Sequence, residues 1–347
     1  MHIAGRPIGP GSAPFVIAEM SGNHNQSLER ALAIVDAAAA SGAHALKLQT
    51  YTADSMTLRV RTGDFFIDNP KSPWFGQCLH DLYQVASTPY EWHAPIFRRA
   101  QELGLIAFST PFDAASVAFL EELNVPCYKI ASFENTDLPL IRAVAATGKP
   151  MIISTGMATA AELDDTVRTA RTHGCHDLVL LKCTSSYPAS PENSNLRTIP
   201  HLRKLFGCEV GLSDHTLGVG VSVAAVTLGA TVIEKHFTLS RGDGGVDSTF
   251  SMEPTEMRML VDETERAWQS LGDVRYGPTE AELGSLRFRR SLYVAAHLRA
   301  GDVLTPDNLR VVRPGFGLAP KFYEQVLGRC VNRDITLGEP LQWDCMG

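Results

Sequence analysis

The sequence predicts an α/β fold: a parallel (β/α)8 TIM barrel followed by a small second domain. Two observations indicate the barrel. From residue 16 to about residue 270, a short apolar run rich in β-branched residues precedes an Ala-rich amphipathic stretch eight times. The apolar runs are continuous rather than alternating, which is typical of parallel strands covered on both faces. Eight βα units with short connections favour a closed barrel.

The expected elements follow one another regularly. Strands are expected at residues 16–21, 45–50, 106–111, 127–132, 151–156, 178–184, 209–214 and 231–236. Helices are expected at residues 28–41, 91–103, 114–122, 138–146, 160–173, 195–206, 219–228 and 254–271. Several helices have a glycine just past their end, such as Gly42, Gly104 and Gly272, which is a typical C-cap position.

An open, doubly wound sheet is the alternative fold. It would need a Gly-rich phosphate-binding turn after the first strand. The residues there are EMSGNHN (19–25), which do not form a GxGxxG pattern. The barrel therefore remains the expected fold.

One connection breaks the regular spacing. About forty residues, 51–90, separate the second strand from its helix, and they include Phe65, Phe66, Pro70 and Trp74. A long loop at the C-terminal face of a barrel is usually a functional lid or wall. The alternative is a surface excursion with a small core of its own.

The composition changes after Gly272. Residues 1–272 are assigned to the barrel, residues 273–286 read as a polar linker, and residues 287–347 form a unit of short strands and Gly turns. About sixty residues is near the lower limit for independent folding. We therefore expect this unit to pack on a barrel.

Charge and cysteine content limit the function classes. The formal net charge is −7 and no basic block occurs, which argues against a nucleic-acid partner. The sequence has no basic segment leading into an apolar one and no run of 18 apolar residues, so we expect neither a signal peptide nor a membrane span. Seven scattered cysteines without a CxxC pair indicate reduced thiols in a cytoplasmic protein.

Polar side chains at the strand ends are the candidates for catalysis, because a barrel places its active site there. They are Glu19, Asn23, His24, Lys47, Gln49, Ser109, Thr110, Lys129, Ser132, Ser154, Thr155, Lys182, Thr184, Ser185, Tyr187, Ser213, Asp214, His215, Glu234, Lys235 and His236. Alternation along a strand puts Glu234 and His236 on one face, with Lys235 opposite, and puts Lys47 with Gln49. Charged residues in buried strands are costly unless they have a role. A buried structural ion pair is the alternative for Lys47 and Glu234.

His215 and His236 end neighbouring strands, which lie about 4.8 Å apart. Two imidazoles can therefore bind one divalent cation and leave positions for water and substrate oxygens. We expect Mn²⁺, Mg²⁺ or Co²⁺, and zinc is disfavoured because no thiolate is expected nearby. Cations and hydroxyls on the same rim suit a phosphate or carboxylate; these are Lys47, Lys129, Ser132, Ser154, Ser185 and Ser213.

The sequence resembles the sialic acid synthase family, whose enzymes condense phosphoenolpyruvate with an amino-sugar aldose. The motifs are IAEMSGNHN (17–25), LKLQTY (46–51), STPF (109–112), YKIAS (128–132), STGMAT (154–159), GLSDHT (211–216) and EKHF (234–237). RSLY (290–293) and RPGFGL (313–318) resemble the antifreeze-like (SAF) domain of these enzymes. The resemblance covers nearly the whole chain, in order.

Within the family the chain is most similar to the pseudaminate-forming branch. The motifs are QTYTADSMTL (49–58), TPYEWH (88–93), KIASFE (129–134), LKCTSSYP (181–188) and VDSTFSM (246–252). Ser185 replaces an Asn of sialate and legionaminate synthases, and Gln26 replaces the last residue of an NHNG turn. The implied aldose is 2,4-diacetamido-2,4,6-trideoxy-L-altrose. N-acetylneuraminate or legionaminate synthesis from a mannosamine-type aldose is the alternative.

The resemblance also implies residue roles. Phosphoenolpyruvate would be bound by Lys47, Thr110, Lys129, Ser132, Ser154, Ser185 and Ser213. The metal would be bound by His215 and His236, which with Glu19 and Glu234 are the catalytic candidates. The sugar would be held by Gln49, Tyr187, Asp247 and Arg313, with Glu19 beside it. Arg313 would come from the antifreeze-like domain of a partner, which implies a domain-swapped homodimer.

Other functions stay open from the residues alone. A 3-deoxy-aldulosonate-8-phosphate synthase would use the same enolpyruvate, but the basic cluster for a phosphorylated aldose is not evident. A Schiff-base aldolase would act through Lys129 or Lys47. A pure binding protein would leave the polar rim without a purpose. Between Glu19 and Glu234, the sequence does not assign which is the acid and which the base.

Overall fold

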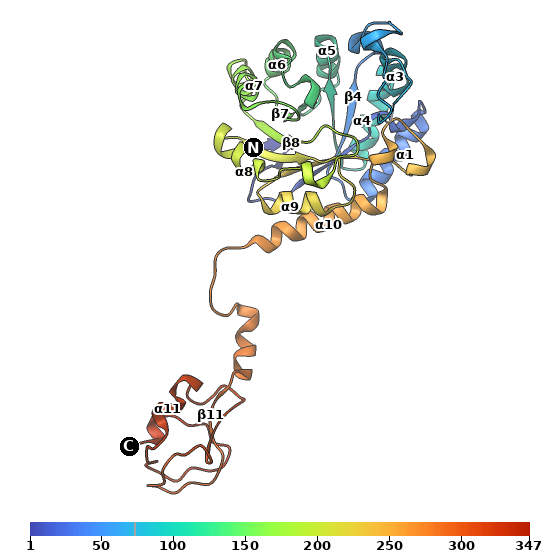
Figure 1. The fold of residues 1–347 in the computed structure, drawn as a ribbon. Coiled ribbons are helices and arrows are strands. Elements are labelled where there is room, and N and C mark those ends of the chain that lie inside the picture. The colour runs from blue at the N-terminus through green and yellow to red at the C-terminus, as the bar shows by residue number, and fades with distance from the viewer. Residues whose placement is uncertain (73) are drawn as a thin grey trace. The chain divides into compact units, whose positions relative to one another are not determined.

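The computed structural model describes residues 1–72 and 74–347, which form two compact units, Met1–Gly272 and Asp273–Gly347. In the first unit eight parallel strands form a closed barrel, with the last strand paired to the first (Figure 1). The strands are β3 (Phe15–Glu19), β4 (Ala45–Thr50), β5 (Ile106–Pro111), β6 (Tyr128–Ile130), β7 (Met151–Ser154), β8 (Leu178–Cys183), β9 (Glu209–Ser213) and β10 (Val232–His236). The predicted barrel is confirmed, and each strand lies within two residues of its expected bounds.

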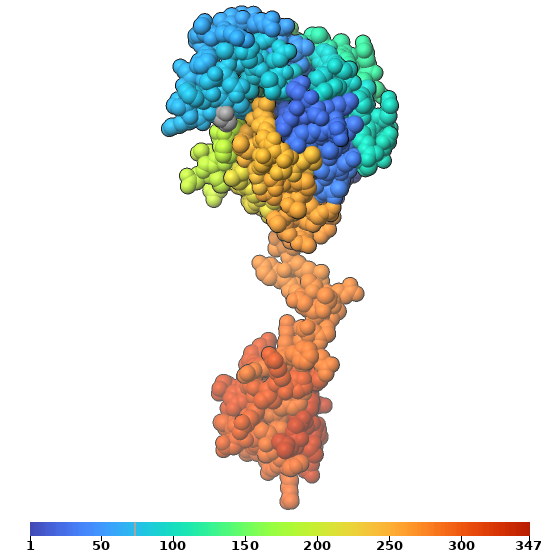
Figure 2. All heavy atoms as spheres, turned by 90° about the vertical axis from the view of Figure 1, so that its right-hand side faces the viewer, coloured from blue at the N-terminus to red at the C-terminus, as the bar shows by residue number. Residues whose placement is uncertain are grey.

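Helices surround the barrel as expected. They are α1 (Leu28–Ala40), α4 (Tyr90–Glu102), α5 (Ala114–Glu122), α6 (Leu138–Ala145), α7 (Ala160–Thr172), α8 (Thr198–Phe206), α9 (Gly220–Thr227) and α10 (Pro254–Leu271). α1 and α10 pack side by side, which closes the ring (Figures 1 and 2). α8 begins three residues later than predicted, because Asn195 has a φ of 44°, outside the right-handed helical region.

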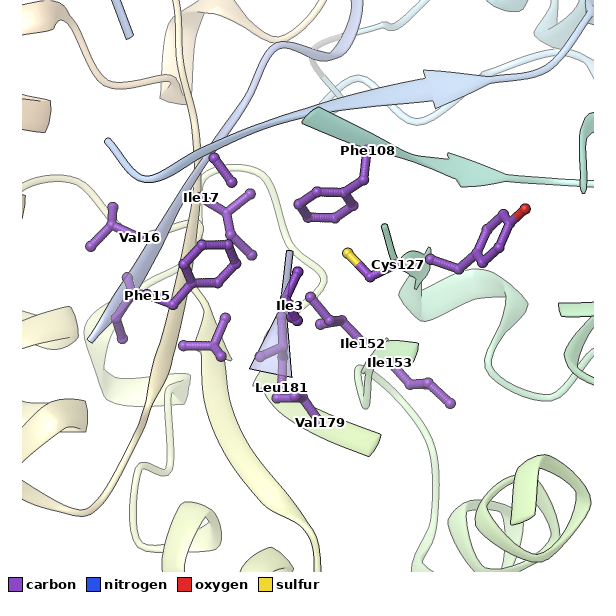
Figure 3. Close-up of a cluster of buried hydrophobic side chains, with 14 of the residues drawn as sticks. Ile3, Phe15, Val16, Ile17, Phe108, Cys127, Ile152, Ile153, Val179 and Leu181 are labelled. Carbon is purple, nitrogen blue, oxygen red and sulfur yellow. The ribbon is translucent and has the colours of Figure 1, made fainter. Parts of the chain in front are cut away.

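A short hairpin precedes the barrel and was not predicted. It consists of β1 (His2–Ile3) and β2 (Arg6–Pro7), joined by Ala4 and Gly5, both at positive φ. Ile3 is fully buried, with Phe15, Ile152 and Val179 around it (Figure 3). These neighbours lie in the first halves of their strands. The hairpin therefore closes the N-terminal end of the barrel.

The long connection after β4 contains two short helices. They are α2 (Ala53–Met56) and α3 (Leu79–Ala86). α3 buries Leu82 and Ala86, whereas Val85 on its other face is exposed. The connection is therefore packed against the barrel unit along α3.

The second unit has its own small core. β11 (Ser291–Val294) pairs with β12 (Leu309–Val312) in an antiparallel ladder, and α11 (Tyr323–Val326) covers them in the same core. The predicted linker is partly ordered: a 3-10 helix, η7, spans Glu280–Phe288. Its start is fixed by a capping box between Thr279 and Glu282, a local signal that the linker interpretation overlooked.

Two further predictions concern the whole chain. Among the described residues, no helix combines the length and apolarity needed to cross a bilayer. The seven cysteines are all free thiols.

Candidate active site

A cavity of about 290 Å³ opens at the C-terminal ends of the barrel strands. Most of the predicted site residues line it: Glu19, Lys47, Gln49, Lys129, Ser132, Ser154, Tyr187, Ser213, His215, Glu234, His236 and Asp247. They come from widely separated parts of the sequence, so only the closed barrel brings them together.

The register of the strands explains the grouping. Glu19 on β3 is paired with Lys47 on β4 and with His236 on β10. Glu234, two residues before His236, is paired with Ser213 on β9. Residues paired across parallel strands point to the same side of the sheet. The predicted alternation is confirmed, because Lys235 points outward to Asp214, 3.1 Å from it.

Two buried lysines and two buried carboxylates meet at the base of the cavity. Lys47 Nζ lies 2.7 Å from Glu19 Oε2 and 3.8 Å from Glu234 Oε1. Lys129 Nζ lies 3.9 Å from Glu234 Oε1. These ion pairs match the structural alternative for Lys47 and Glu234, but they line a cavity rather than a sealed core. The cluster can therefore both stabilise the fold and receive a charged ligand.

The two carboxylates are in different electrostatic environments. Burial raises the pKa of Glu19 and outweighs the charge of Lys47, which lowers it; the charge of Glu234 raises it further. Burial alone would also raise the pKa of Glu234, but Lys129 and Lys47 outweigh burial and lower it. A pair of acids whose pKa values are pushed apart is suited to complementary proton-transfer roles.

Lys129 is held among hydroxyl and carbonyl oxygens. Its Nζ donates to Ser154 Oγ at 2.7 Å and to the carbonyl of Ile130 at 2.8 Å. Beside it, the Gly156 backbone approaches two serines: a Cβ built on Gly156 would lie 2.2 Å from Ser185 Oγ and 2.6 Å from Ser132 Oγ. Only glycine fits there. Lys129, Ser132 and Ser154 all line the cavity, and this donor set suits an oxyanion.

The two predicted metal ligands lie close together. The ring centres of His215 and His236 are 5.3 Å apart. His215 Nδ1 is 3.0 Å from the carbonyl of Thr184, a contact that fixes Nδ1 as the donor and leaves Nε2 free for a ligand. His236 Nδ1 is buried and has no hydrogen-bond partner among the described residues; Asp247 Oδ2 lies 3.6 Å from it. Burial also lowers the pKa of His236 well below its usual value, which favours the neutral, metal-binding form.

A thiol lies next to this pair, which the sequence interpretation excluded. Cys183 Sγ is 3.9 Å from His215 Nδ1. Burial opposes ionisation of the thiol, but the hydrogen bond and charge of His215 outweigh it and lower the pKa of Cys183 to about 7. The expectation that no thiol lies nearby was therefore wrong, while the choice of metal stays a prediction. The alternation that turns Lys182 outward also turns Cys183 inward, and could have revealed it.

Two predicted site residues of the first unit, Thr110 and Ser185, do not line the cavity. Thr110 lies behind Lys47, whose Nζ donates to its hydroxyl at 3.2 Å. Ser185 Oγ lies 3.7 Å from Cys183 Sγ. Arg313 is an exposed residue of the second unit. Thr110 and Ser185 are thus one layer removed from the cavity surface.

Several cavity residues were not among the individual site residues that the sequence predicted. Ser21 donates a short hydrogen bond to Asp247 Oδ2, which orients that carboxylate. Trp74, from the long connection, lies 6.0 Å from the ring of Tyr187. Glu134, in the 3-10 turn after β6, lines the cavity, and one of its carboxylate oxygens has no hydrogen-bond partner in the described part of the chain. No periodic pattern marks these positions, because all three lie outside the strands.

The replacement Glu134→Gln is expected to stabilise the ligand-free protein at alkaline pH. Burial raises the pKa of Glu134 from 4.5 to about 7. The folded form therefore holds this proton more tightly than the unfolded form, and stability is lost as pH rises between these values. We expect the variant to melt about 3 °C above the wild type at pH 8 and at the same temperature at pH 4. Glu192→Gln, at an exposed position, is the control; equal melting temperatures at pH 8 would contradict the prediction.

Comparison with known proteins identifies relatives along the whole chain. The NeuB family model matches residues 34–276, and the SAF domain model matches residues 289–346. Pseudaminic acid synthase of Campylobacter jejuni is 44% identical over 94% of this chain and 95% of the relative. Pseudaminic acid synthase of Helicobacter pylori is 42% identical over 95% and 97%. N,N'-diacetyllegionaminic acid synthase of Legionella pneumophila is 36% identical over 98% and 96%.

Solved structures agree with these relatives. The N-acetylneuraminic acid synthetase of Leptospira borgpetersenii superposes with a TM-score of 0.73 at 31% identity, covering 83% of this chain and 95% of the other. The spore coat polysaccharide biosynthesis protein spsE of Bacillus subtilis gives a TM-score of 0.68 at 32% identity, covering 100% and 99%.

Proposed function

Because the chain belongs to the NeuB family, we propose that it condenses phosphoenolpyruvate with 2,4-diacetamido-2,4,6-trideoxy-L-altrose and water to give pseudaminic acid and phosphate. The observation that carries the proposal is the 42–44% identity to pseudaminic acid synthases over nearly the full length. The legionaminate synthase relative is 36% identical. The enzyme is thus a transferase that forms a carbon–carbon bond.

Phosphoenolpyruvate is assigned to the two lysines and the serines around them. Its phosphate and carboxylate need several positive charges, and Lys47 and Lys129 are the cations at the cavity base. Ser132, Ser154 and Ser213 add hydroxyl donors on the same surface. Their convergence supports the proposal, since charge-assisted hydrogen bonds to oxyanions are strong in a partly dry site.

The two carboxylates are assigned complementary roles. C3 of phosphoenolpyruvate attacks the aldehyde carbon, water adds at C2, and the C2–O bond to phosphate then breaks. Glu19, with its raised pKa, donates a proton to the aldehyde oxygen as that oxygen gains negative charge. Glu234 stays ionised, stabilises the positive charge that develops at C2 and accepts a proton from the incoming water.

The family resemblance also implies a divalent cation, and the residues present fit one. His215 and His236 would hold Mn²⁺, Mg²⁺ or Co²⁺. The free Nε2 of His215 supports this role, as does the Nδ1 of His236, which has no hydrogen-bond partner among the described residues. When bound, such an ion supplies Lewis-acid polarisation of a carbonyl oxygen. Gln49, Tyr187 and Asp247 line the same cavity and would orient the sugar.

We further propose that the enzyme is a domain-swapped homodimer of the cytoplasm. Exposed apolar side chains of the first unit, Phe133, Met157 and Leu217, lie in loops that follow barrel strands, which supports a cover over this rim. Arg313 of a second copy would then reach the acyl group of the sugar. The free thiols support a reducing compartment.

Offering phosphoenolpyruvate with several 2-acetamido aldoses tests the function directly. We expect phosphate release and a nine-carbon product only with the 2,4-diacetamido-2,4,6-trideoxy aldoses, and fastest with the L-altro isomer. The product is identified by mass spectrometry and NMR. Turnover of N-acetylmannosamine alone would overturn the pseudaminate assignment.

A further inference from the structure

The cavity has a charged side and an apolar side. Along β4 and just beyond it, Lys47, Gln49 and Tyr51 all line the cavity, because alternate residues of a strand share a face. The side chains therefore change from an ammonium to an amide to a phenol in the direction of the barrel mouth. A substrate that reaches from the base to the mouth would pass from polar to apolar surroundings.

The connection after β4 supplies most of the apolar side. We call this surface the apolar wall; it comprises Tyr51, Met56, Trp74, Leu79, Leu82 and Tyr83. The indole N–H of Trp74 already donates to the carbonyl of Val246 at 3.0 Å. Of the described residues between 51 and 86 that line the cavity, none carries a charge. The remaining polar atoms of the wall are two phenol hydroxyls, which suit a neutral partner such as an amide carbonyl.

We propose that the apolar wall selects the methyl group at C6 of a 6-deoxy aldose and rejects a hydroxymethyl group there. The inference rests on the proposed function, which supplies a sugar whose reacting end lies at the charged base. A hydroxymethyl group against the wall would give up its hydrogen bonds to water and find few partners. A methyl group at the same place only removes apolar surface from water.

Gln26 positions this wall. Its Nε2 donates to the carbonyls of Val85 and Ser87, at 2.7 and 2.8 Å, at the C-terminal end of α3. These carbonyls belong to the group that a helix leaves without internal partners. Gln26 has a φ of 54°, where glycine is preferred. The chain therefore accepts an unfavourable backbone conformation at Gln26 and gains two side-chain bonds that hold α3, with Leu79, Leu82 and Tyr83, against the cavity.

The selectivity of the wild-type enzyme tests the wall. kcat/KM is measured at saturating phosphoenolpyruvate with the 2,4-diacetamido-2,4,6-trideoxy aldose and with its counterpart that has a hydroxyl group at C6. We expect the 6-deoxy sugar to be preferred on the order of 10- to 100-fold. Equal values would overturn the inference while leaving the proposed function standing. No product from either sugar would overturn the proposed function, and the inference with it.

Leu79→Asn places an amide in the apolar wall at the half-buried first residue of α3. We expect the preference for the 6-deoxy sugar to fall about 10-fold, because the amide can bond the added hydroxyl. Val85→Asn is the matched control, since Val85 lies on the same helix and is 53% exposed. A preference unchanged by Leu79→Asn, or lowered equally by both variants, would contradict the role of the wall.

Gln26→Gly removes the two bonds to α3 and relaxes the backbone. As a positioning residue, Gln26 should affect KM for the sugar, which we expect to rise several-fold, with KM for phosphoenolpyruvate unchanged. Gln84→Ala is the control, because Gln84 is exposed on the same helix. An unchanged KM for the sugar would show that Gln26 does not position the wall.

Discussion

Lys129→Met is expected to lower kcat/KM for phosphoenolpyruvate by about 1,000-fold. Lys129 is fully buried and donates to Ser154 Oγ and the Ile130 carbonyl, so it is already oriented before the substrate arrives. Its ammonium also balances Glu234, 3.9 Å away. Methionine keeps the length of the side chain but leaves both the substrate anion and Glu234 without this cation.

Lys182→Met is the matched control for this variant. Lys182 also lies near the end of a barrel strand, but its Nζ donates to Cys183 O and Thr184 Oγ1 and it does not line the cavity. We expect its effect on kcat/KM to be within about threefold. Circular dichroism establishes that both variants fold. A loss below about 10-fold for a folded Lys129→Met would remove Lys129 from the phosphoenolpyruvate site.

His236→Ala is expected to lower turnover by at least about 100-fold and to abolish tight Mn²⁺ binding. Burial lowers the pKa of His236 well below its usual value, and its Nδ1 has no hydrogen-bond partner among the described residues. Alanine therefore removes one of two imidazoles whose ring centres are 5.3 Å apart. Binding is measured by titration calorimetry and turnover by phosphate release. Chelation of the wild type should remove activity to a similar extent, and Mn²⁺ should restore it.

His201→Ala is the control, because His201 lies exposed on α8. It should bind Mn²⁺ and turn over like the wild type. Activity that survives both chelation and His236→Ala would show that the reaction proceeds without a metal. Loss of activity with unchanged Mn²⁺ affinity would assign His236 to the substrate instead.

The barrel could be predicted from the sequence because each of its signals is local. Continuous apolar runs define the strands, and glycines such as Gly42 and Gly272 mark helix ends. Alternation of side chains along a strand predicted which polar residues at the strand ends share a face. Glu234 and His236 were in this way correctly placed on the same face. These features repeat in every βα unit, which allows weak local signals to support one another.

The remaining site features depend on contacts between distant segments. The hairpin of residues 2–7 has strands of two residues, too short for any periodic pattern. Glu134 and Trp74 reach the cavity from turns, where chain direction is set by tertiary packing. The sequence shows that Gln26 stands where related chains have the glycine of an NHNG turn. Its two hydrogen bonds to the end of α3 can be seen only in the structure.

The hairpin at the N-terminal end of the barrel also limits the route by which ligands reach the cavity. Ile3 is fully buried at the N-terminal end of the barrel, so in the described part of the chain the cavity opens only at the C-terminal ends of the strands. Lys47 and Lys129 lie at the base of that cavity. With the ligand assignments proposed above, we therefore expect phosphoenolpyruvate to bind before the sugar.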